Sequence, residues 1–318
     1  MTPSTFPQLL GAFFRLIRWK NILMVAVSMY LARYALIYRI LAGTDGGSTF
    51  THADFCMLVL SVVFITAGGY LINDFFDIRI DRINKGDRVV LGRYFSLRFA
   101  LYTHHFFSAA GMLLGFYASY RAGSLSLGGL HVIGVAILWF YAARYKRIMI
   151  LGNVVVSLLS ALVIPLVWLF EFFALRQDGV IFASAMPDFA ALNRVVLLYL
   201  VFSFLLSMSR EIVKDIQDMH GDRIYQCRTY PVLYGNRSGM LLAGLFQLLS
   251  LVILAIILFY LAKLRIMPLF YYILFLITMP LLGLFYQTVR PGGPVRTVEQ
   301  GLKLLMFIGI LSMIFIQL

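Results

Sequence analysis

Two short windows of the sequence hold carboxylates at a repeated spacing. The first window runs from Asn73 to Arg88 and reads NDFFDIRIDRINKGDR, and the second runs from Ser209 to Arg223 and reads SREIVKDIQDMHGDR. Eight of the 14 acidic residues of the chain fall in these two windows, so their clustering needs a chemical explanation. Each window contains three carboxylates at positions i, i+3 and i+7, which are Asp74, Asp77 and Asp81 in the first and Asp215, Asp218 and Asp222 in the second.

The spacing brings the three carboxylates together if a helix continues through each window. A step of 100° per residue puts positions i, i+3 and i+7 within about 60° of arc, so they share one face of the helix. Like charges this close repel one another, and the repulsion grows near a low-dielectric boundary. A divalent cation is the natural compensation, and a ligand set made only of oxygen favours Mg²⁺. The alternative for any single one of these residues is a solvated charge at the end of a membrane span.

Long apolar segments must position these windows. A chain of 318 residues with 61% hydrophobic and 13% charged residues cannot enclose its apolar side chains in one soluble core, so the solvent must be lipid. We expect an all-α, polytopic membrane protein with one transmembrane domain over residues 1–318, in which residues 1–20 lie at the membrane interface. About nine spans are predicted, at 21–41, 55–73, 99–118, 126–143, 150–173, 190–209, 239–262, 267–287 and 302–318.

The distribution of basic residues predicts the orientation of the chain. Twenty of the 27 lysines and arginines flank alternate ends of the spans, so the net charge of +13 indicates a membrane side and not a nucleic-acid partner. That side should be cytosolic in the cell membrane, with the N-terminus inside and the C-terminus outside. Both acidic windows then lie at the cytosolic exits of the second and sixth spans. This equivalence predicts a pseudo-repeat of four helices, with the acidic faces opposed across a shared cavity and a diphosphate bridging their metal ions.

These motifs resemble those of the UbiA-type intramembrane prenyltransferases, and the resemblance extends over the whole chain. NDFFDIRID matches the NDxxDxxxD motif of the family, and DIQDMHGD matches its DxxDxxxD motif. Also similar are the basic-Asn element from Arg18 to Asn21, the stretch YAARYKR from Tyr141 to Arg147, and the Gly152-Asn153 pair. The nine-helix fold of the family agrees with the count of spans.

The resemblance implies Mg²⁺-dependent transfer of an isoprenoid from its diphosphate to a small lipid-soluble acceptor. The implied metal ligands are Asn73, Asp74, Asp77 and Asp81 for one ion and Asp215, Asp218 and Asp222 for the other. The residues expected to take part in catalysis are Asp74, Asp77, Asp215, Asp218, Lys146 and Tyr141. Those expected to bind substrate are Asn21, Asn73, Arg79, Lys214, Arg144 and Asn153.

Several of these residues have a structural alternative. Lys146 either lies by the diphosphate, as the family motif implies, or anchors the chain at the cytosolic surface. Phe75, Phe76 and Tyr141 either line a cavity that shields an allylic carbocation or serve in helix packing and the interfacial belt. Asn21 and Asn153 either act in the site or make hydrogen bonds between helices.

The sequence of the second motif indicates which acceptor the chain uses. SREIVKDIQDMHGDR followed by CRTYPVLYG looks most like the branch of the family that makes archaeal-type ether lipids. In that branch geranylgeranyl diphosphate alkylates geranylgeranylglyceryl phosphate. The alternative is prenylation of an aromatic quinone precursor such as hydroxybenzoate, dihydroxynaphthoate or homogentisate. A secondary transporter is the alternative outside the class, because intramembrane carboxylates also mark ion pathways. Oligomeric state does not follow from these features.

Overall fold

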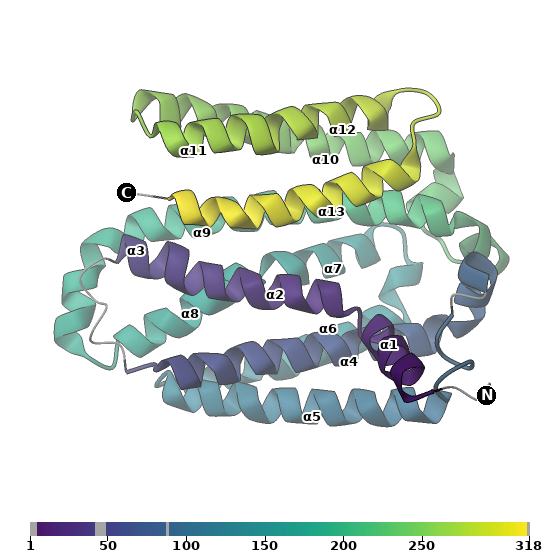
Figure 1. Ribbon diagram of the computed structural model, residues 1–318, viewed down its shortest axis with the longest axis horizontal. Helices are drawn as coiled ribbons and strands as arrows, with labels where there is room; N and C mark the ends of the chain where they lie inside the picture. Colours follow the sequence, from purple (N-terminus) through teal and green to yellow (C-terminus); the bar gives the residue numbers. More distant parts are fainter. Residues whose placement is uncertain (1–4, 42–48, 87–88, 317–318) are drawn as a thin grey trace. The chain divides into compact units, whose positions relative to one another are not determined.

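The chain is helical almost throughout. The computed structural model describes residues 5–41, 49–86 and 89–316 (Figure 1). Within these ranges the structure contains no β-strand, and the one β-bridge joins Leu91 to Phe95. The prediction of an all-α protein is therefore confirmed.

Long helices alternate with short connections. In chain order the main helices are α1 (Phe6–Leu16), α2 (Trp19–Leu31), α3 (Tyr38–Ile40), α4 (His52–Lys85), α5 (Leu97–Arg121), α6 (Gly128–Ala143), α7 (Leu151–Ala161), α8 (Val163–Leu175), α9 (Gly179–Ile224), α10 (Tyr230–Lys263), α11 (Met267–Tyr272), α12 (Met279–Val289) and α13 (Val295–Leu311). Two π-helical segments keep the chain helical between neighbours, Ala32–Ile37 between α2 and α3 and Ile273–Thr278 between α11 and α12. These two π-helical segments therefore extend the helices on either side and do not end them.

The number of spans differs from the prediction. In the part of the chain that the structure describes, seven helices are long and apolar enough to cross a membrane, or eight if α7 and α8, bent by 42°, form one broken span. The count of nine is not confirmed. The predicted span missing from this count is the third, 99–118, which coincides with α5 and its 25 residues. This helix does not reach the same apolarity because it carries His104, His105 and several hydroxyl side chains.

The described chain forms two compact units. The first contains α1, the part of α2 up to Met29, helices α4 to α6 and the segment Leu169–Ser184. The second contains residues 30–41, Arg147–Trp168 and residues 185–316. Each acidic window lies in a different unit, and in both units it occupies the last turns of a long helix that a short connection joins to another long helix.

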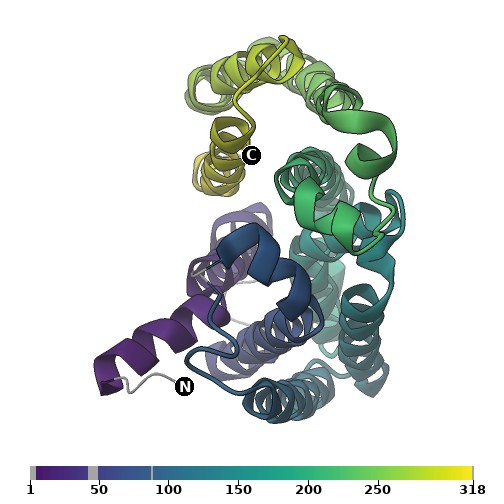
Figure 2. The same cartoon turned by 90° about the vertical axis from the view of Figure 1, so that its right-hand side faces the viewer.

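In the first unit, α4 and α5 run side by side, and α6 packs against both (Figures 1 and 2). Small residues permit the close approach. A methyl group added at Gly115 of α5 would lie 2.4 Å from the ring of His131 on α6. Buried polar side chains then join the helices, since Ser61 donates to the carbonyl oxygen of Gly111 at 2.6 Å and its Oγ lies 2.8 Å from Nδ1 of His131.

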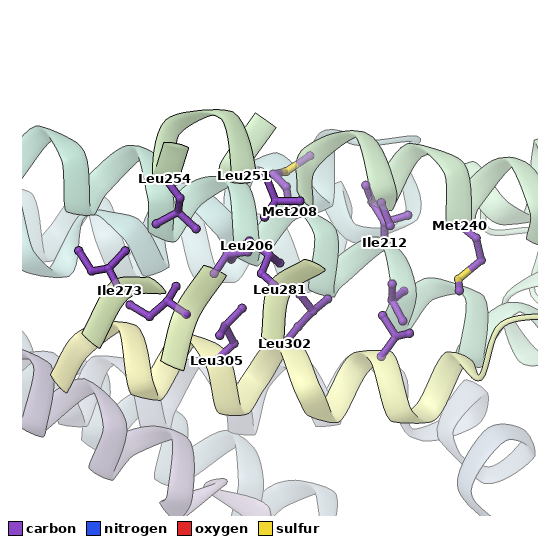
Figure 3. Packing of buried hydrophobic residues seen from close by; sticks show 14 of the residues in the cluster. Leu206, Met208, Ile212, Met240, Leu251, Leu254, Ile273, Leu281, Leu302 and Leu305 are labelled. Carbon is purple, nitrogen blue, oxygen red and sulfur yellow. The ribbon is translucent and has the colours of Figure 1, made fainter. Parts of the chain in front are cut away.

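The second unit has a core of aliphatic side chains from four long helices. Figure 3 shows these residues pointing toward one another from α9, α10, α12 and α13 and the adjoining π-helical segment. The residues labelled there are Leu206, Met208, Ile212, Met240, Leu251, Leu254, Ile273, Leu281, Leu302 and Leu305. Because Ile212 lies in the second acidic window, three residues before Asp215, this packing fixes the base of the second carboxylate triplet.

The N-terminal helix α1 is amphipathic. Phe6, Leu10 and Phe14 follow one another at four-residue steps and expose 76%, 45% and 43% of their surface. On the other face Ala12 and Leu16 are buried. This pattern is typical of a helix that lies in a membrane interface, and its interfacial position stays a prediction.

The close contact between α5 and α6 predicts a difference between two glycines. Gly115→Ala should destabilise the protein by about 1–3 kcal/mol, because the added methyl group overlaps the His131 ring. Gly134→Ala in α6 meets no atom within 4 Å and should be neutral or slightly stabilising. The measurement is the midpoint of thermal unfolding in detergent, and equal midpoints for the two variants would contradict the packing described.

Candidate functional site

Helices run through the carboxylate triplets of both acidic windows. Helix α4 continues through the first window to Lys85, and α9 continues through the second to Ile224. The carboxylates of each window therefore share a helix face, as predicted. We call Asn73, Asp74, Asp77 and Asp81 the first acidic face, and Asp215, Asp218 and Asp222 the second acidic face.

Arg18 compensates the charge of Asp74 in the first acidic face. The two side chains meet at 2.8 Å between Nη2 and Oδ1, and they are 28% and 19% exposed. The guanidinium also lies 4.7 Å from the centre of the Tyr70 ring. Burial acts to lower the pKa of Arg18, and the Asp74 carboxylate more than offsets this, so the pKa lies above its ordinary value. Asn21 joins the same group because its amide donates to the Tyr70 hydroxyl at 3.2 Å.

Lys146 compensates the charge of Asp77. Its Nζ lies 2.6 Å from Oδ1 of Asp77, and only 11% of the lysine side chain and 17% of the aspartate side chain are exposed. Asn73 completes the group, because its amide nitrogen donates to Asp77 at 3.0 Å and its amide oxygen accepts from Lys146 at 3.3 Å. Lys146 comes from the connection after α6, so this contact brings together two of the predicted motifs.

The second acidic face has its own partners in the second unit. Asn153, in the first turn of α7, donates to Oδ2 of Asp215 at 2.8 Å. One turn earlier on α9, Glu211 accepts from Lys214 at 3.2 Å and from Arg210 at 2.9 Å. Arg210 also reaches Glu299 of α13 at 2.7 Å. The cations near this face are therefore held by glutamates that lie outside the motif.

The other predicted residues differ in their burial and in their contacts with the two acidic faces. Asp81 lines a cavity beside Asp74, and Asp218, Asp222 and Tyr141 are half-buried. Arg79 and Arg144 are exposed, and in the described residues no ion pair or hydrogen bond joins either to an acidic face. Of the aromatic residues, Phe75 contacts Phe76 edge to face with ring centres 5.4 Å apart.

The donor set suits magnesium. Among the described residues, no three His, Cys, Asp or Glu side chains are arranged to enclose a metal ion by themselves. Mg²⁺ does not require such a cage, since it usually takes one or two carboxylates and fills its octahedron with water and phosphate oxygens. The first acidic face offers carboxylates and one amide oxygen, with no nitrogen or sulfur ligand among them. These residues therefore fit a magnesium ion that is shared with a phosphate.

Sequence reasoning missed three residues of these groups. Arg18 stood in the basic-Asn element that the resemblance singled out, but it was not assigned a contact. Tyr70 precedes Asn73 by one turn on the same face of α4, so its helical position was a usable signal. Glu299 is a lone acidic residue near the start of α13, and nothing in the local sequence indicates its contact with Arg210.

The backbone is unusual next to these groups. Of the four non-glycine residues with positive φ in the described chain, three lie here, with φ of 53° at Arg18, 61° at Ile150 and 54° at Gln226. Arg18 links α1 to α2, Ile150 precedes the helix that carries Asn153, and Gln226 follows α9. Such conformations cost free energy in L-residues and persist where surrounding contacts enforce them. They turn the chain sharply at the ends of the helices that carry the site.

Fold and site together define a polytopic helical membrane protein with acid-rich helix ends that are compensated by cations. Residues 34–308 match the UbiA prenyltransferase family. The chain belongs to this family, and the resemblance seen in its motifs is confirmed.

Relatives of known name support the same branch. The chain is similar to digeranylgeranylglyceryl phosphate synthase of Methanothermobacter thermautotrophicus, with 33% identity over 201 residues. That alignment covers 62% of this chain and 62% of the relative. The synthase of the same name from Methanosarcina barkeri is 27% identical over 307 residues, which cover 95% of this chain and 96% of the relative.

Two solved structures share the fold. A structure reported for digeranylgeranylglyceryl phosphate synthase in membranes matches with a TM-score of 0.59 and 25% identity, covering 96% of this chain and 98% of that one. A UbiA homolog from Archaeoglobus fulgidus, bound to DMAPP and Mg²⁺, matches with a TM-score of 0.54 and 16% identity, covering 95% and 98%. The second likeness shows the fold alone.

The left-handed residue after α9 predicts opposite effects for two glycine substitutions. Gln226 is exposed and has φ of 54°, so Gln226→Gly should raise the free energy of unfolding by about 1 kcal/mol. Gln217 is exposed within α9, where glycine should lower it by about 1 kcal/mol. Thermal unfolding in detergent checks both, and a lower midpoint for Gln226→Gly would show that the left-handed conformation is not adopted.

Proposed function

We propose that the protein transfers a prenyl group from a prenyl diphosphate to a lipid-soluble acceptor in a magnesium-dependent reaction. The observation that carries the proposal is the pairing of acidic helix ends with uncharged and cationic donors, which are Arg18 and Lys146 at the first acidic face and the Asn153 amide at the second. Carboxylates alone would repel a diphosphate. Carboxylates for magnesium, with Lys146 and Arg18 beside them, can accommodate its negative charge.

The reaction exchanges one carbon–oxygen bond for another. The bond between C1 of the prenyl chain and the diphosphate oxygen breaks, and diphosphate leaves with the electron pair. A hydroxyl oxygen of the acceptor then bonds to C1, and its proton passes to a carboxylate or to a diphosphate oxygen. Magnesium, when bound, supplies positive charge that stabilises the leaving group. Lys146 and Lys214 are assigned to stabilise the leaving diphosphate as hydrogen-bond donors. Asn73 and Asn153 orient the carboxylates of the two faces.

Aromatic residues are well placed to shield the carbocation beside the first acidic face. Phe75 and Phe76 stand on α4 between Asp74 and Asp77, and Phe76 meets Trp139 of α6 with ring centres 5.7 Å apart. Such rings stabilise a cation through their π-faces and exclude water that would capture it. Tyr141, two residues after Trp139 and half-buried, is assigned to the same wall.

The acceptor we propose is geranylgeranylglyceryl phosphate, with geranylgeranyl diphosphate as donor. This assignment is supported by the names of the relatives, which are digeranylgeranylglyceryl phosphate synthases over up to 96% of their length. The product would be a diether lipid phosphate. Prenylation of an aromatic acid is the competing activity that the assay below tests.

We also propose that the protein resides in the cytoplasmic membrane with its acidic helix ends in the cytosol. The concentration of basic residues around these ends supports that orientation. A C-terminus outside requires an odd number of crossings, which the count of eight spans reaches only if α5 crosses as well. A phosphatase fused after α13, which is active only outside the cytosol, should be active, and an inactive fusion would place the C-terminus inside.

The proposed reaction depends on both acidic faces. Purified wild-type protein with Mg²⁺ and labelled geranylgeranyl diphosphate should alkylate geranylgeranylglyceryl phosphate. Asp74→Ala and Asp215→Ala should each lower the rate by on the order of 100-fold or more, because each removes a metal ligand. Both variants should also bind fewer Mn²⁺ ions, measured as a magnesium substitute by electron paramagnetic resonance.

Asp188→Asn is the matched control for these variants, since Asp188 is exposed on α9 and lies far along the helix from the second acidic face. It should keep wild-type activity and Mn²⁺ binding. Product from an aromatic acid but none from the glyceryl phosphate would replace the proposed acceptor. Full activity in Asp74→Ala or Asp215→Ala would refute the metal assignment.

A further inference from the structure

A cavity of about 170 Å³ lies beside the first acidic face in the first unit. Arg15 and Arg18 line one part of it, and Asp74 and Asp81 line another. Residues 89–91, which are Val-Val-Leu, form its apolar wall. The cavity therefore combines cationic, anionic and apolar walls within a small volume, as a site for a short amphiphilic molecule requires.

The two arginines of this cavity differ in their partners. Arg18 forms an ion pair with Asp74, with 2.8 Å between Nη2 and Oδ1. Arg15 is exposed, and in the described part of the chain its guanidinium contacts the Tyr94 ring, 5.8 Å from the centroid, while no carboxylate pairs with it. Its hydrogen-bonding capacity thus remains available to an anion in the cavity.

We propose that this cavity binds the phosphate monoester of the glyceryl phosphate acceptor and that Arg15 is its main ligand. The inference rests on the proposed function and adds a subsite to it. A planar guanidinium matches two oxygens of a phosphate, which a single ammonium group does not. The single free hydroxyl of the acceptor, on the glycerol carbon next to the one that carries the phosphate ester, then falls toward the wall that carries Asp74 and Asp81.

The cavity wall opposite α4 is built to hold its position. Gly92 adopts φ of 82°, and its N–H donates to the carbonyl oxygen of Phe95 at 2.8 Å, which closes a tight turn. Phe95 in turn stacks on Phe99 at 4.7 Å and meets Phe13 of α1 at 6.3 Å. These contacts pack the turn against α1, the helix that carries Arg15. The backbone at Arg15 is therefore held in place by packed side chains.

The apolar face of α1 explains how a lipid acceptor could reach the cavity. Phe6, Leu10 and Phe14 form the exposed stripe of α1, and Phe14 immediately precedes Arg15. A helix that lies in the membrane interface along this stripe holds Arg15 at the level of phosphate head groups. The hydrocarbon chain of the acceptor can then stay in the bilayer while its phosphate enters the cavity.

The test compares substrates that differ only in the phosphate. In nanodiscs of zwitterionic lipid, Arg15→Gln should raise the KM for geranylgeranylglyceryl phosphate about tenfold or more and leave the KM for geranylgeranyl diphosphate unchanged. With unphosphorylated geranylgeranylglycerol, wild type and variant should be equally slow. Arg15→Lys, which keeps the charge but loses the fork of donors, should give an intermediate KM and serves as well if the glutamine variant does not fold.

Arg93→Gln is the matched control. Arg93 also lies over the Tyr94 ring, at 5.5 Å, but it does not line the cavity, so its loss should leave the acceptor KM unchanged. Equal acceptor KM values for wild type and Arg15→Gln would overturn the proposal. A rise in the KM for the diphosphate instead would assign the cavity to the donor and would overturn it too.

A second readout does not depend on turnover. Labelled geranylgeranylglyceryl phosphate should bind wild type in the presence of EDTA and bind Arg15→Gln at least about tenfold more weakly. If anionic bilayer lipid displaces it as efficiently as unlabelled acceptor, the cavity is a general head-group site and the proposal fails. Wild type that forms no product from this acceptor refutes the proposed function, whereas product formation that is indifferent to Arg15 refutes only the subsite.

Discussion

The need to compensate carboxylates at the ends of apolar helices organises both acidic faces. A carboxylate near a low-dielectric boundary is costly unless a cation or a hydrogen-bond donor lies against it. In the first unit that requirement draws Arg18 to Asp74 and Lys146 to Asp77, from segments that lie far from α4 in sequence. In the second unit it draws Asn153 to Asp215. The same charges that suit the site for metal therefore also determine which chain segments meet there.

Compensation is shared differently in the two units. The cations of the first unit touch the acidic face itself. In the second unit, Lys214 and Arg210 are held by Glu211 and Glu299, while Asp215 has an uncharged donor. Asp215 is thus compensated by an amide where Asp74 and Asp77 are compensated by cations, although the spacing of the two faces is the same. Sequence spacing alone would have suggested two equal sites.

The sequence predicts those features of the fold and the site that depend on local periodicity. The three-and-seven spacing of Asp74, Asp77 and Asp81 fixes a helix face because each step is 100°, and α4 runs through the window as required. The pairing of Arg18 with Asp74 spans 56 positions, and no local pattern encodes it. Arg79 and Arg144 were chosen for charge and proximity in sequence, yet they are exposed. The count of nine spans is not confirmed at α5, because His104 and His105 lower the apolarity of this helix.

The length of α9 has a mechanical consequence. From Asp188, directly after the Pro187 inside the helix, to Ile224 it measures about 55 Å at 1.5 Å per residue, nearly twice the thickness of a hydrocarbon core of about 30 Å. The helix has no break between its apolar segment and Asp222. The depth of the carboxylates relative to the membrane surface is therefore set by how the bilayer holds this helix. A thinner or thicker membrane changes the tilt of the helix or its position along the bilayer normal. Bilayer thickness therefore alters the distance of the metal-binding turns from the membrane surface.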